Sequence, residues 1–293
     1  MNFQIVPLSA GLYFVATPIG AARDMTLRGL DILASADILA AEDTRTARKL
    51  MDIHGIPLGT RQLIAYHDHS GQSQVQRLVA AVKNGKSVAY VSEAGTPLVS
   101  DPGYELGVAM AAQDLSVTSA PGPSAALAAL TVSGLASDRF AFIGFLPSAE
   151  SARKTEIAEL RDTAMTLIFF ESPRRVGELL VNLRDGLGAE RQAVVCRELT
   201  KKFEDVSRGT LADLADHFHT RTVKGEIVVL VARSTQTATS EADVQNALRE
   251  ALKSMRVKDA ATTVAGAMGL PRRQVYQLAL DVAKTPDPAQ DQS

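Results

Sequence analysis

The stretch Leu12-Tyr-Phe-Val-Ala-Thr-Pro-Ile-Gly20 decides the fold class of this chain. Its first part, Leu12 to Ala16, is a short apolar run, which predicts a buried strand. The turn Thr17-Pro18-Ile19-Gly20 follows directly, and glycine and proline there allow the backbone to approach a ligand closely. A helical spacing of apolar residues over 27–34 comes next. Strand, turn and helix in this order indicate an α/β unit with parallel strands.

The same alternation continues through the first 121 residues. The periodicity predicts a helix over 75–82 that ends at Asn84-Gly85. Further short apolar runs predict strands at 38–41, 63–66, 88–91 and 115–118. We therefore expect residues 1–121 to form an α/β domain with a mainly parallel sheet covered by helices.

A second α/β domain is expected over residues 122–233. Apolar runs predict strands at 140–143, 167–170, 193–197 and 227–232, and the spacing over 176–183 predicts a helix. Because strands outnumber helices in this half, we expect a mixed sheet with some antiparallel pairing.

The C-terminal part has a different pattern. Residues 234–242 are rich in serine and threonine and indicate a linker, and 243–284 carry three helical stripes. Gly269 between the last two stripes gives a helix–turn–helix layout. This small helical domain is either a basic nucleic-acid-binding module or a plain packing module. The polar tail 285–293 is expected to be disordered.

Composition bounds the class of protein. The chain has 293 residues, 46% of them hydrophobic and 22% charged, which is typical of a globular protein. No apolar run reaches the roughly 18 residues of a membrane span, and no secretory signal is evident, so a cytoplasmic protein without membrane association is expected. The formal net charge of −2 means that any RNA binding depends on local patches.

Four loops follow predicted strands, where ligands bind in open parallel sheets. Each resembles an ordinary βα turn when taken singly, and none is a Walker loop or a dinucleotide fingerprint. They are 17–20, 42–45 (Glu-Asp-Thr-Arg), 92–103 (Ser-Glu-Ala-Gly-Thr-Pro, continuing to Ser100-Asp-Pro-Gly103) and 121–125 (Pro-Gly-Pro-Ser-Ala).

Taken together, these loops in this order resemble the tetrapyrrole methylase superfamily, and within it the branch that methylates a cytidine ribose 2′-hydroxyl in the decoding region of 16S ribosomal RNA. The resemblance runs from about Gly11 to Val231 and includes the tail domain. It continues in Gly144-Phe-Leu-Pro147, Phe170-Glu-Ser-Pro173, Arg197-Glu-Leu-Thr-Lys201 and Lys224-Gly-Glu226. The sequence departs from the family pattern at Ala21, Glu93, Ala149 and Arg174.

The resemblance implies the tetrapyrrole methylase fold, in which two α/β domains hold S-adenosylmethionine in the cleft between them. It also implies a substrate in the small ribosomal subunit and a homodimer. Carried over residue by residue, it gives the cofactor-binding candidates Pro18, Gly20, Gly95, Thr96, Val99, Ser124, Ala125, Phe170, Arg197 and Gly225.

The reaction needs positioning of the ribose oxygen and removal of its proton. Candidates for catalysis are Glu42, Asp43, Glu171, Glu198 and Lys201, and candidates for RNA contact are Arg45, Arg175, Arg272 and Arg273. The alternative for Glu171, Arg197 and Glu198 is a set of structural ion pairs between the domains.

Metal is not expected. His67 and His69 would face the same side of a strand, but a substrate-lining or solvent-facing role is favoured over metal binding. Two rival functions stay open at this stage: methylation of a tetrapyrrole or corrin ring on the same fold, and nucleic-acid binding without catalysis.

Overall fold

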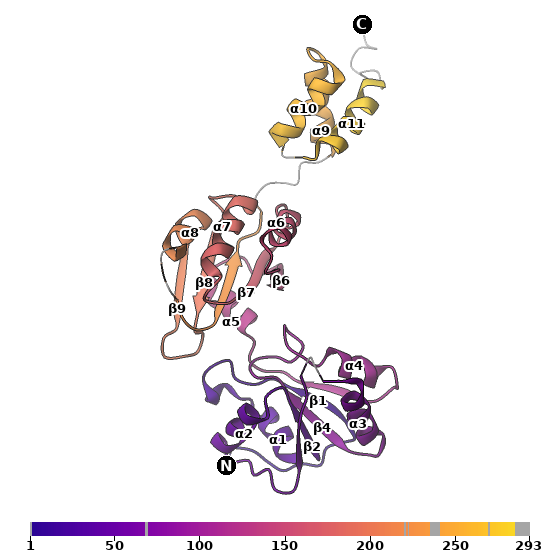
Figure 1. Ribbon diagram of the computed structural model, residues 1–293, viewed down its shortest axis with the longest axis vertical. Coiled ribbons are helices and arrows are strands. Elements are labelled where there is room, and N and C mark those ends of the chain that lie inside the picture. Colours follow the sequence, from indigo (N-terminus) through magenta and orange to yellow (C-terminus); the bar gives the residue numbers. More distant parts are fainter. Residues whose placement is uncertain are drawn as a thin grey trace. The chain divides into compact units, whose positions relative to one another are not determined.

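The computed structural model describes residues 2–67, 70–219, 221, 223–234, 241–268 and 270–284. Contacts divide these residues into two compact units. The larger holds Met165–Arg233 and the described residues up to Arg161, and the smaller holds the C-terminal helices and Asp162–Ala164. Figure 1 shows the two α/β lobes of the larger unit and the separate helical unit.

The first lobe is built on a five-stranded parallel sheet, as the sequence predicts. Its strand order is β3-β2-β4-β1-β5. The strands are β1 (Gly11–Val15), β2 (Ile38–Ala41), β3 (Gln62–Ala65), β4 (Ser87–Val91) and β5 (Val117–Ala120). The connecting helices are a 3₁₀ turn (Ala22–Asp24), α1 (Leu27–Ser35), α2 (Thr44–Ile53), α3 (Gln72–Lys83) and α4 (Tyr104–Ala111).

Alternation along the strands divides the core of this lobe into two layers. Leu39 and Val91 face α1 and α2, while Val88 and Tyr90 face α3 and α4. Because both faces of the sheet are covered, its central strands β1, β2 and β4 are mainly apolar, and β4 is buried along its whole length.

The second lobe has a mixed five-stranded sheet of order β6-β7-β10-β8-β9. Only β6 and β7 pair in parallel, so the expected antiparallel pairing is confirmed. The strands are β6 (Phe140–Phe145), β7 (Thr166–Glu171), β8 (Gln192–Arg197), β9 (Asp205–Thr210) and β10 (Ile227–Val231). The helices are α5 (Ala125–Ser133), α6 (Glu150–Glu159), α7 (Val176–Leu187) and α8 (Leu211–His219).

The two faces of the second sheet have different partners. Helices α6, α7 and α8 pack against Phe169 and Val229 on one face. Helix α5 packs against Ile168 and Leu230 on the other, and Ile19 from the first lobe belongs to this same cluster. The two lobes therefore share part of a hydrophobic core.

The helical unit contains α9 (Glu241–Leu252), α10 (Val257–Met268) and α11 (Arg272–Lys284). Leu248, Val264 and Val275 form its core. Residues 235–240 of the expected linker, Gly269 of the expected turn and the tail 285–293 lie outside the described residues. Over the part of the chain that the structure describes, no helix has the length and apolarity to cross a membrane.

Three local expectations differ from the structure. Strand β5 lies two residues later than predicted, because Leu115 packs against the core beneath α3 and α4 before the strand begins. The third and fourth residues of the 42–45 loop belong to α2, whose N-cap is Asp43. Strand β9 was not predicted, since its sequence Asp-Val-Ser-Arg-Gly-Thr is polar and it lies at the edge of the sheet.

Substitution of a phenylalanine tests the core of the second lobe. Phe169 on β7 is fully buried, whereas Phe203 is 65% exposed. Phe169→Ala should lower the free energy of unfolding by about 3–5 kcal/mol through lost burial and the cavity left behind. Phe203→Ala should change it by less than about 0.5 kcal/mol. Urea unfolding followed by circular dichroism measures both, and equal losses would contradict this packing.

Candidate functional site

Strand order brings three of the four predicted loops together. Since β1 lies between β4 and β5, the loops after these strands emerge side by side. Thr17 N–H donates to the Gly95 carbonyl at 2.8 Å, and Gly95 N–H donates back to the Thr17 carbonyl at 3.0 Å. Thr96 Oγ1 donates to the Pro123 carbonyl at 2.9 Å. The first, third and fourth loops thus form one bonded surface at the carboxyl ends of the strands.

The second predicted loop adjoins this surface. Glu42 Oε2 accepts a hydrogen bond from the Glu93 backbone N–H at 3.0 Å, which ties it to the third loop. Asp43 accepts from the backbone of Arg45 and Thr46 at the start of α2. The side chain of Arg45 and these backbone N–H groups lower the pKa of Asp43 to about 2. Both carboxylates therefore hold the backbone in place.

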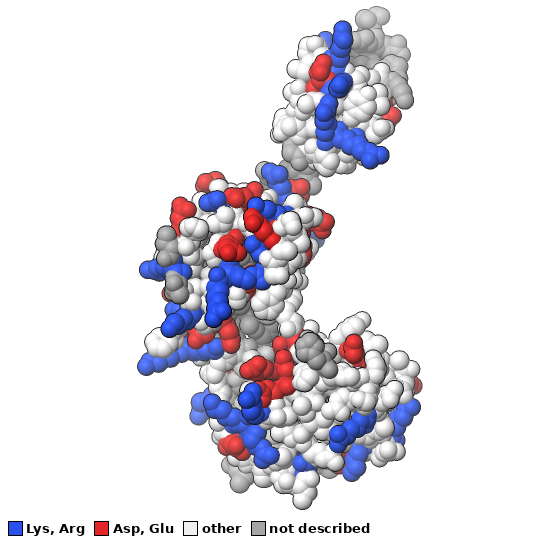
Figure 2. Space-filling model, in the orientation of Figure 1, with Lys and Arg blue, Asp and Glu red and all other residues white. Residues whose placement is uncertain are grey.

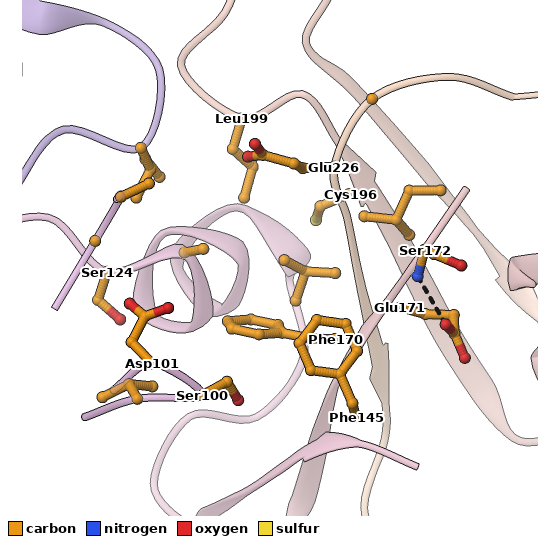
Figure 3. A pocket seen from close by; sticks show the side chains of 18 of the residues that line it. Ser100, Asp101, Ser124, Phe145, Phe170, Glu171, Ser172, Cys196, Leu199 and Glu226 are labelled. Atoms are coloured by element: carbon orange, nitrogen blue, oxygen red, sulfur yellow. Dashed lines mark hydrogen bonds between the residues drawn. The ribbon is translucent and has the colours of Figure 1, made fainter. Parts of the chain in front are cut away.

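A cavity of about 330 Å³ lies between these loops and the ends of strands in the second lobe (Figure 3). Its wall is mostly apolar with a few polar groups, the usual character of a small-molecule site. The lining residues are Ile19, Ala94, Gly95, Thr96, Val99, Ser100, Asp101, Ser124, Ala125, Phe145, Phe170, Glu171, Ser172, Pro173, Cys196, Leu199, Gly225, Glu226, Ile227 and Val228.

Most of the proposed cofactor residues line this cavity. Those that do are Gly95, Thr96, Val99, Ser124, Ala125, Phe170 and Gly225. Pro18, Gly20 and Arg197 do not, and in each case an adjacent residue does. Ile19 lines the cavity between Pro18 and Gly20, and Cys196 does so in place of Arg197, because neighbouring residues of a strand face opposite sides.

Gly20 instead lies at the contact between the lobes. A Cβ at this position would lie 2.5 Å from Lys201 Cγ and 2.6 Å from Thr200 Oγ1. The next residue, Ala21, donates its backbone N–H to Thr200 Oγ1 at 3.1 Å. Ala21, where the sequence departs from the family pattern, is thus bonded to the 198–201 segment through its backbone.

Glu198 and Lys201 form a charged group beside the cavity. Lys201 Nζ lies 3.0 Å from Glu198 Oε1 and 3.1 Å from Glu226 Oε2. Glu198 Oε1 also accepts the Glu226 N–H at 3.0 Å. Gly225 leaves room for this carboxylate, since a Cβ there would lie 2.4 Å from Glu198 Cδ and Oε1.

The charges in this group stabilise one another. The Glu226 N–H and then the Lys201 ammonium lower the pKa of Glu198. Burial acts to lower the pKa of Lys201, but its bonds to Glu198 and Glu226 outweigh burial and raise it. Lys201 is thus held protonated and Glu198 is a weakened base, which favours the ion-pair alternative for Glu198.

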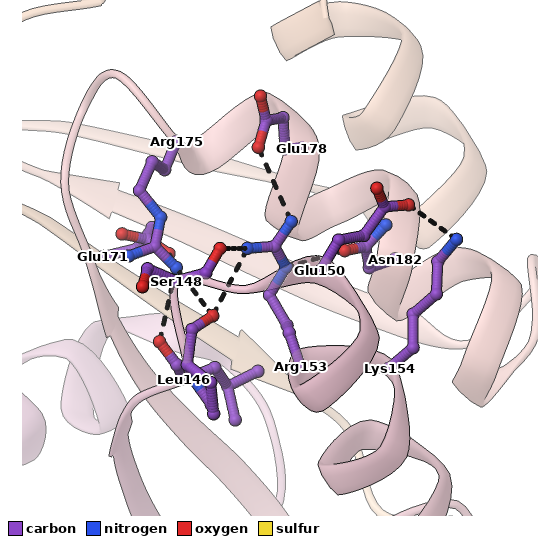
Figure 4. Close-up of polar contacts among 10 residues, drawn as sticks. Leu146, Ser148, Glu150, Arg153, Lys154, Glu171, Arg175, Glu178 and Asn182 are labelled. Carbon is purple, nitrogen blue, oxygen red and sulfur yellow. Dashed lines mark hydrogen bonds and ion pairs between the residues drawn. The ribbon is translucent and has the colours of Figure 1, made fainter.

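Glu171 and Arg175 organise the opposite wall. The Glu171 side chain is 2% exposed, and its carboxylate accepts the Ser172 N–H at 2.7 Å and pairs with Arg175 at 3.2 Å. Arg175 also donates to the carbonyls of Leu146 and Pro147 (Figure 4). These contacts engage the guanidinium internally, so the geometry favours a structural role for Arg175 over RNA contact.

A buried arginine, Arg153, also binds the segment 146–148. Arg153 is 3% exposed and donates to Asn182 at 2.7 Å and to the carbonyls of Pro147 and Ser148 (Figure 4). Its guanidinium lies 3.5 Å from Glu178. The bonds to Pro147 and Ser148 fix the chain just after Phe145, whose ring contributes to the cavity wall.

The other arginine candidates are available at the surface. The Arg45 side chain is 90% exposed and pairs with Asp43 at 2.8 Å. Arg272 and Arg273 are exposed at the start of α11 in the helical unit.

Sequence reasoning missed several cavity residues. Asp101, Phe145 and Glu226 lie inside motifs that it singled out, but their side chains were not selected. Cys196 is buried, and burial raises the pKa of its thiol to about 12, so it acts as a small apolar side chain. His67 follows β3 and is not part of it, while His69 lies outside the described residues. Among described residues, no cluster of three His, Cys, Asp or Glu could hold a metal.

Comparison with known proteins gives two family matches. Residues 11–215 match the model of the Tetrapyrrole (Corrin/Porphyrin) Methylases, and residues 238–283 match that of the RsmI C-terminal HTH domain.

Similar proteins cover nearly all of the chain. A Ribosomal RNA small subunit methyltransferase I from Mesorhizobium japonicum is 47% identical over 95% of this chain and 94% of the relative. A second protein with this name, from Mycobacterium tuberculosis, is 42% identical over 96% of this chain and 99% of the relative. A solved uroporphyrin-III C-methyltransferase from Thermus thermophilus, complexed with S-adenyl homocysteine, shares the fold at a TM-score of 0.53 with 18% identity, covering 75% of this chain and 96% of that chain.

The pKa of Glu198 gives a pH-dependent prediction. Because folding lowers this pKa, the carboxylate stabilises the fold above its unfolded pKa, and this stability disappears as the pH falls through the folded pKa. Glu198→Gln should lower the free energy of unfolding at pH 7 by about 1 kcal/mol, since a charged hydrogen-bond acceptor is lost. The difference in unfolding free energy between this variant and the unsubstituted protein should disappear at acidic pH.

Urea unfolding at several pH values between 7 and 3 measures this difference. Glu159→Gln, which alters an exposed carboxylate on α6, is the matched control and should change the unfolding free energy by less than about 0.5 kcal/mol. A Glu198→Gln effect that is the same at every pH would contradict the charged pairing.

Proposed function

The chain belongs to the tetrapyrrole methylase family, and from that premise we propose that it methylates the ribose 2′-hydroxyl of a cytidine in 16S ribosomal RNA of the small subunit. It is an S-adenosylmethionine-dependent methyltransferase. The observation that carries the proposal is the largely apolar cavity at the ends of β1, β4 and β5 in a chain whose relatives are named ribosomal RNA methyltransferases.

The cavity residues fit S-adenosylmethionine. About 330 Å³ falls within the roughly 300–1,000 Å³ of small-molecule sites, and a mainly apolar wall suits an adenine ring and the carbon chain of the methionine part. We propose that Gly95, Thr96, Ser124, Ala125 and Gly225 hold the cofactor largely through backbone groups and that Val99 and Phe170 pack against it. When bound, the cofactor supplies a methyl group already activated on a sulfonium.

The protein contributes position more than covalent chemistry. The paired loops fix one wall, and Arg153 and Arg175 fix the opposite wall through residues 146–148. In this proposal Glu171, Glu198 and Lys201 shape the site, because each is already engaged in an ion pair. Glu42 and Asp43 likewise support the loops through the bonds that they accept.

RNA binding is proposed to use local basic groups. Residues 241–284 contain seven Lys or Arg against five Asp or Glu, although the whole chain has a net charge of −2. Figure 2 shows Lys and Arg side chains gathered along one face of the helical unit. We propose that Arg272 and Arg273 contact phosphates there and that Arg45 does so beside the cavity, since arginine suits phosphate contact.

A tetrapyrrole substrate is not favoured. The neighbour that acts on such a ring is 18% identical to this chain and supports the fold alone. The two relatives named for ribosomal RNA match 95% and 96% of this chain at 47% and 42% identity, and the C-terminal domain has its own family match.

Two further features complete the proposal. We propose a homodimer, in which exposed apolar side chains of the first lobe such as Leu27 and Ile53 would gain burial. We propose a cytoplasmic location, where ribosomal subunits are found.

Methyl transfer tests the proposed function. Small subunits lacking this modification should accept tritium from methyl-labelled S-adenosylmethionine, and the label should map to one cytidine whose ribose then resists alkaline cleavage. Label on a base, or none, would overturn the proposal.

A glycine pair tests the assignment of the cavity. Gly225→Ala should lower the affinity for S-adenosylmethionine about tenfold, or roughly 1.4 kcal/mol of binding free energy, because the new Cβ displaces Glu198. Calorimetry measures this affinity. Gly188→Ala has a similar positive φ, +106° against +96°, but meets nothing within 4 Å, so it controls for backbone strain. Equal affinities of the two variants would contradict the assignment.

Arg45→Ala tests the phosphate contact. It should weaken binding to small subunits several-fold and reduce the slope of log affinity against log salt by about 1, with cofactor affinity unchanged. Arg184→Ala, which removes an arginine paired with Asp185 near the end of α7, is the control. Filter binding at several salt concentrations measures both, and matching slopes for the two variants would exclude the contact.

A further inference from the structure

The connection between β8 and β9 presents an exposed aromatic ring beside the cavity (Figure 1). Phe203 is 65% exposed, and it lies in the turn that the Glu204 N–H closes by donating to the Lys201 carbonyl at 3.2 Å. Leu199, four residues before Phe203, lines the cavity. Four residues span at most about 14 Å, so the backbone of Phe203 lies within that distance of the cavity wall.

Backbone conformation and hydrogen bonds hold this loop in one shape. Glu198 and Thr200 have positive φ values of 53° and 63°, which are uncommon for residues with side chains and cluster at functional sites. The Glu204 carboxylate accepts the Thr200 N–H at 2.5 Å, and Thr200 Oγ1 accepts the Ala21 N–H from the first lobe at 3.1 Å. A ring on a loop that is already ordered loses little conformational freedom when it binds a partner.

Positive charge beside the ring is available to an anionic partner. Lys202 Nζ lies 5.5 Å from the centroid of the Phe203 ring. Lys224 is also exposed, and the adjacent Gly225 lines the cavity. Within the part of the chain that the structure describes, neither lysine forms an ion pair with a carboxylate.

The two acidic residues that follow the ring have bonds of their own. Glu204 binds the Thr200 N–H, and Asp205 accepts a hydrogen bond from Ser207 Oγ at 3.2 Å. Both carboxylates are thus bonded within the loop and β9 and leave the neighbouring lysine ammonium groups to solvent.

The size and surroundings of the exposed ring favour an unpaired RNA base over a protein surface as its partner. An aromatic side chain buries about 150–250 Å², whereas a stable protein interface buries about 800 Å² on each partner. The other residues from 200 to 205 are polar or charged. An isolated ring beside lysines is typical of single-stranded RNA sites, where bases stack on aromatic side chains and cations contact the phosphates.

We propose that Phe203 stacks on an unpaired RNA base beside the target cytidine and that Lys202 contacts a phosphate of the same strand, an inference that rests on the proposed function. Phe203 is not among the residues that line the cavity, so the base that it holds is a neighbour of the nucleotide that is methylated. Stacking at this point fixes the position of the strand, and thereby brings the adjoining ribose to the cavity.

Binding of the full chain to small subunits that lack the modification tests the ring. Phe203→Ala should lower the affinity about tenfold, whereas Phe203→Tyr, which keeps an aromatic face, should stay within about threefold. Phe203→Leu keeps apolar bulk without an aromatic face and should bind as weakly as Phe203→Ala. Filter binding measures all three, and an affinity of Phe203→Ala or Phe203→Leu equal to that of the unsubstituted protein would overturn the proposal.

Phe140→Ala is the matched control for the ring. Phe140 is 41% exposed and begins β6, at the end of the second sheet away from the β8–β9 connection. Its removal should leave the affinity for small subunits unchanged. An equal loss of affinity in Phe140→Ala and Phe203→Ala would contradict a contact specific to Phe203.

The salt dependence of binding tests the lysine. Lys202→Gln should reduce the slope of log affinity against log salt by about 0.7, because one contact with a single-stranded phosphate is lost. Phe203→Ala removes no charge and should keep the slope of the unsubstituted protein. Lys154→Gln, which alters a lysine paired with Glu150 on α6, is the control. Equal slopes for Lys202→Gln and Lys154→Gln would exclude the phosphate contact.

Ultraviolet crosslinking of the same complexes identifies the partner of the ring. A nucleotide should become attached to the peptide that contains Phe203, because a stacked base reacts with the side chain that it touches. Crosslinks elsewhere with none at Phe203, or a Phe203→Ala variant that sediments with a smaller mass, would assign the ring to a protein contact and overturn the proposal.

The two proposals fail in different ways. Small subunits that crosslink to Phe203 but accept no methyl group from the unsubstituted protein would refute the proposed function alone. Normal methylation by the unsubstituted protein, together with full affinity of Phe203→Ala, would refute only the stacking contact.

Discussion

The paired hydrogen bonds between Thr17 and Gly95 are the contact on which the site depends. They exist because β1 lies between β4 and β5, so that loops from distant parts of the sequence leave the sheet next to one another. The bond from Thr96 to Pro123 adds the loop after β5. Glycine suits this contact, because Gly95 has a φ of +80°, a backbone conformation that residues with side chains rarely adopt.

Charge at the meeting of the lobes is mainly structural. Lys201 binds two carboxylates, and Arg175 binds Glu171 together with two carbonyls. Each cation therefore fixes a segment that borders the cavity. Such a network explains how a methyltransferase can have many ionisable residues around its site while needing few of them for proton transfer.

The sequence predicted the fold because apolar periodicity follows directly from burial, and every strand of the first sheet was anticipated. Strand β9 is polar and lies at an edge, and α5 is Ala-rich with apolar residues on all sides, so neither has a periodic signal. Seven of the ten cofactor candidates line the cavity, and the other three are each next to a residue that does. Motifs could not show that Cys196 lines the cavity and that Arg197 does not, because side-chain direction depends on the tertiary structure.

The residues that line the cavity are spread along the sequence, from Ile19 as the first to Val228 as the last. During synthesis domains fold as units, the N-terminal one first, yet no partial chain can offer this wall before β10 has been made and paired. Cofactor capture is consequently a marker of finished folding. A ligand that binds only the finished form also shifts the folding equilibrium toward it, so the cellular concentration of the cofactor would set part of the enzyme's lifetime.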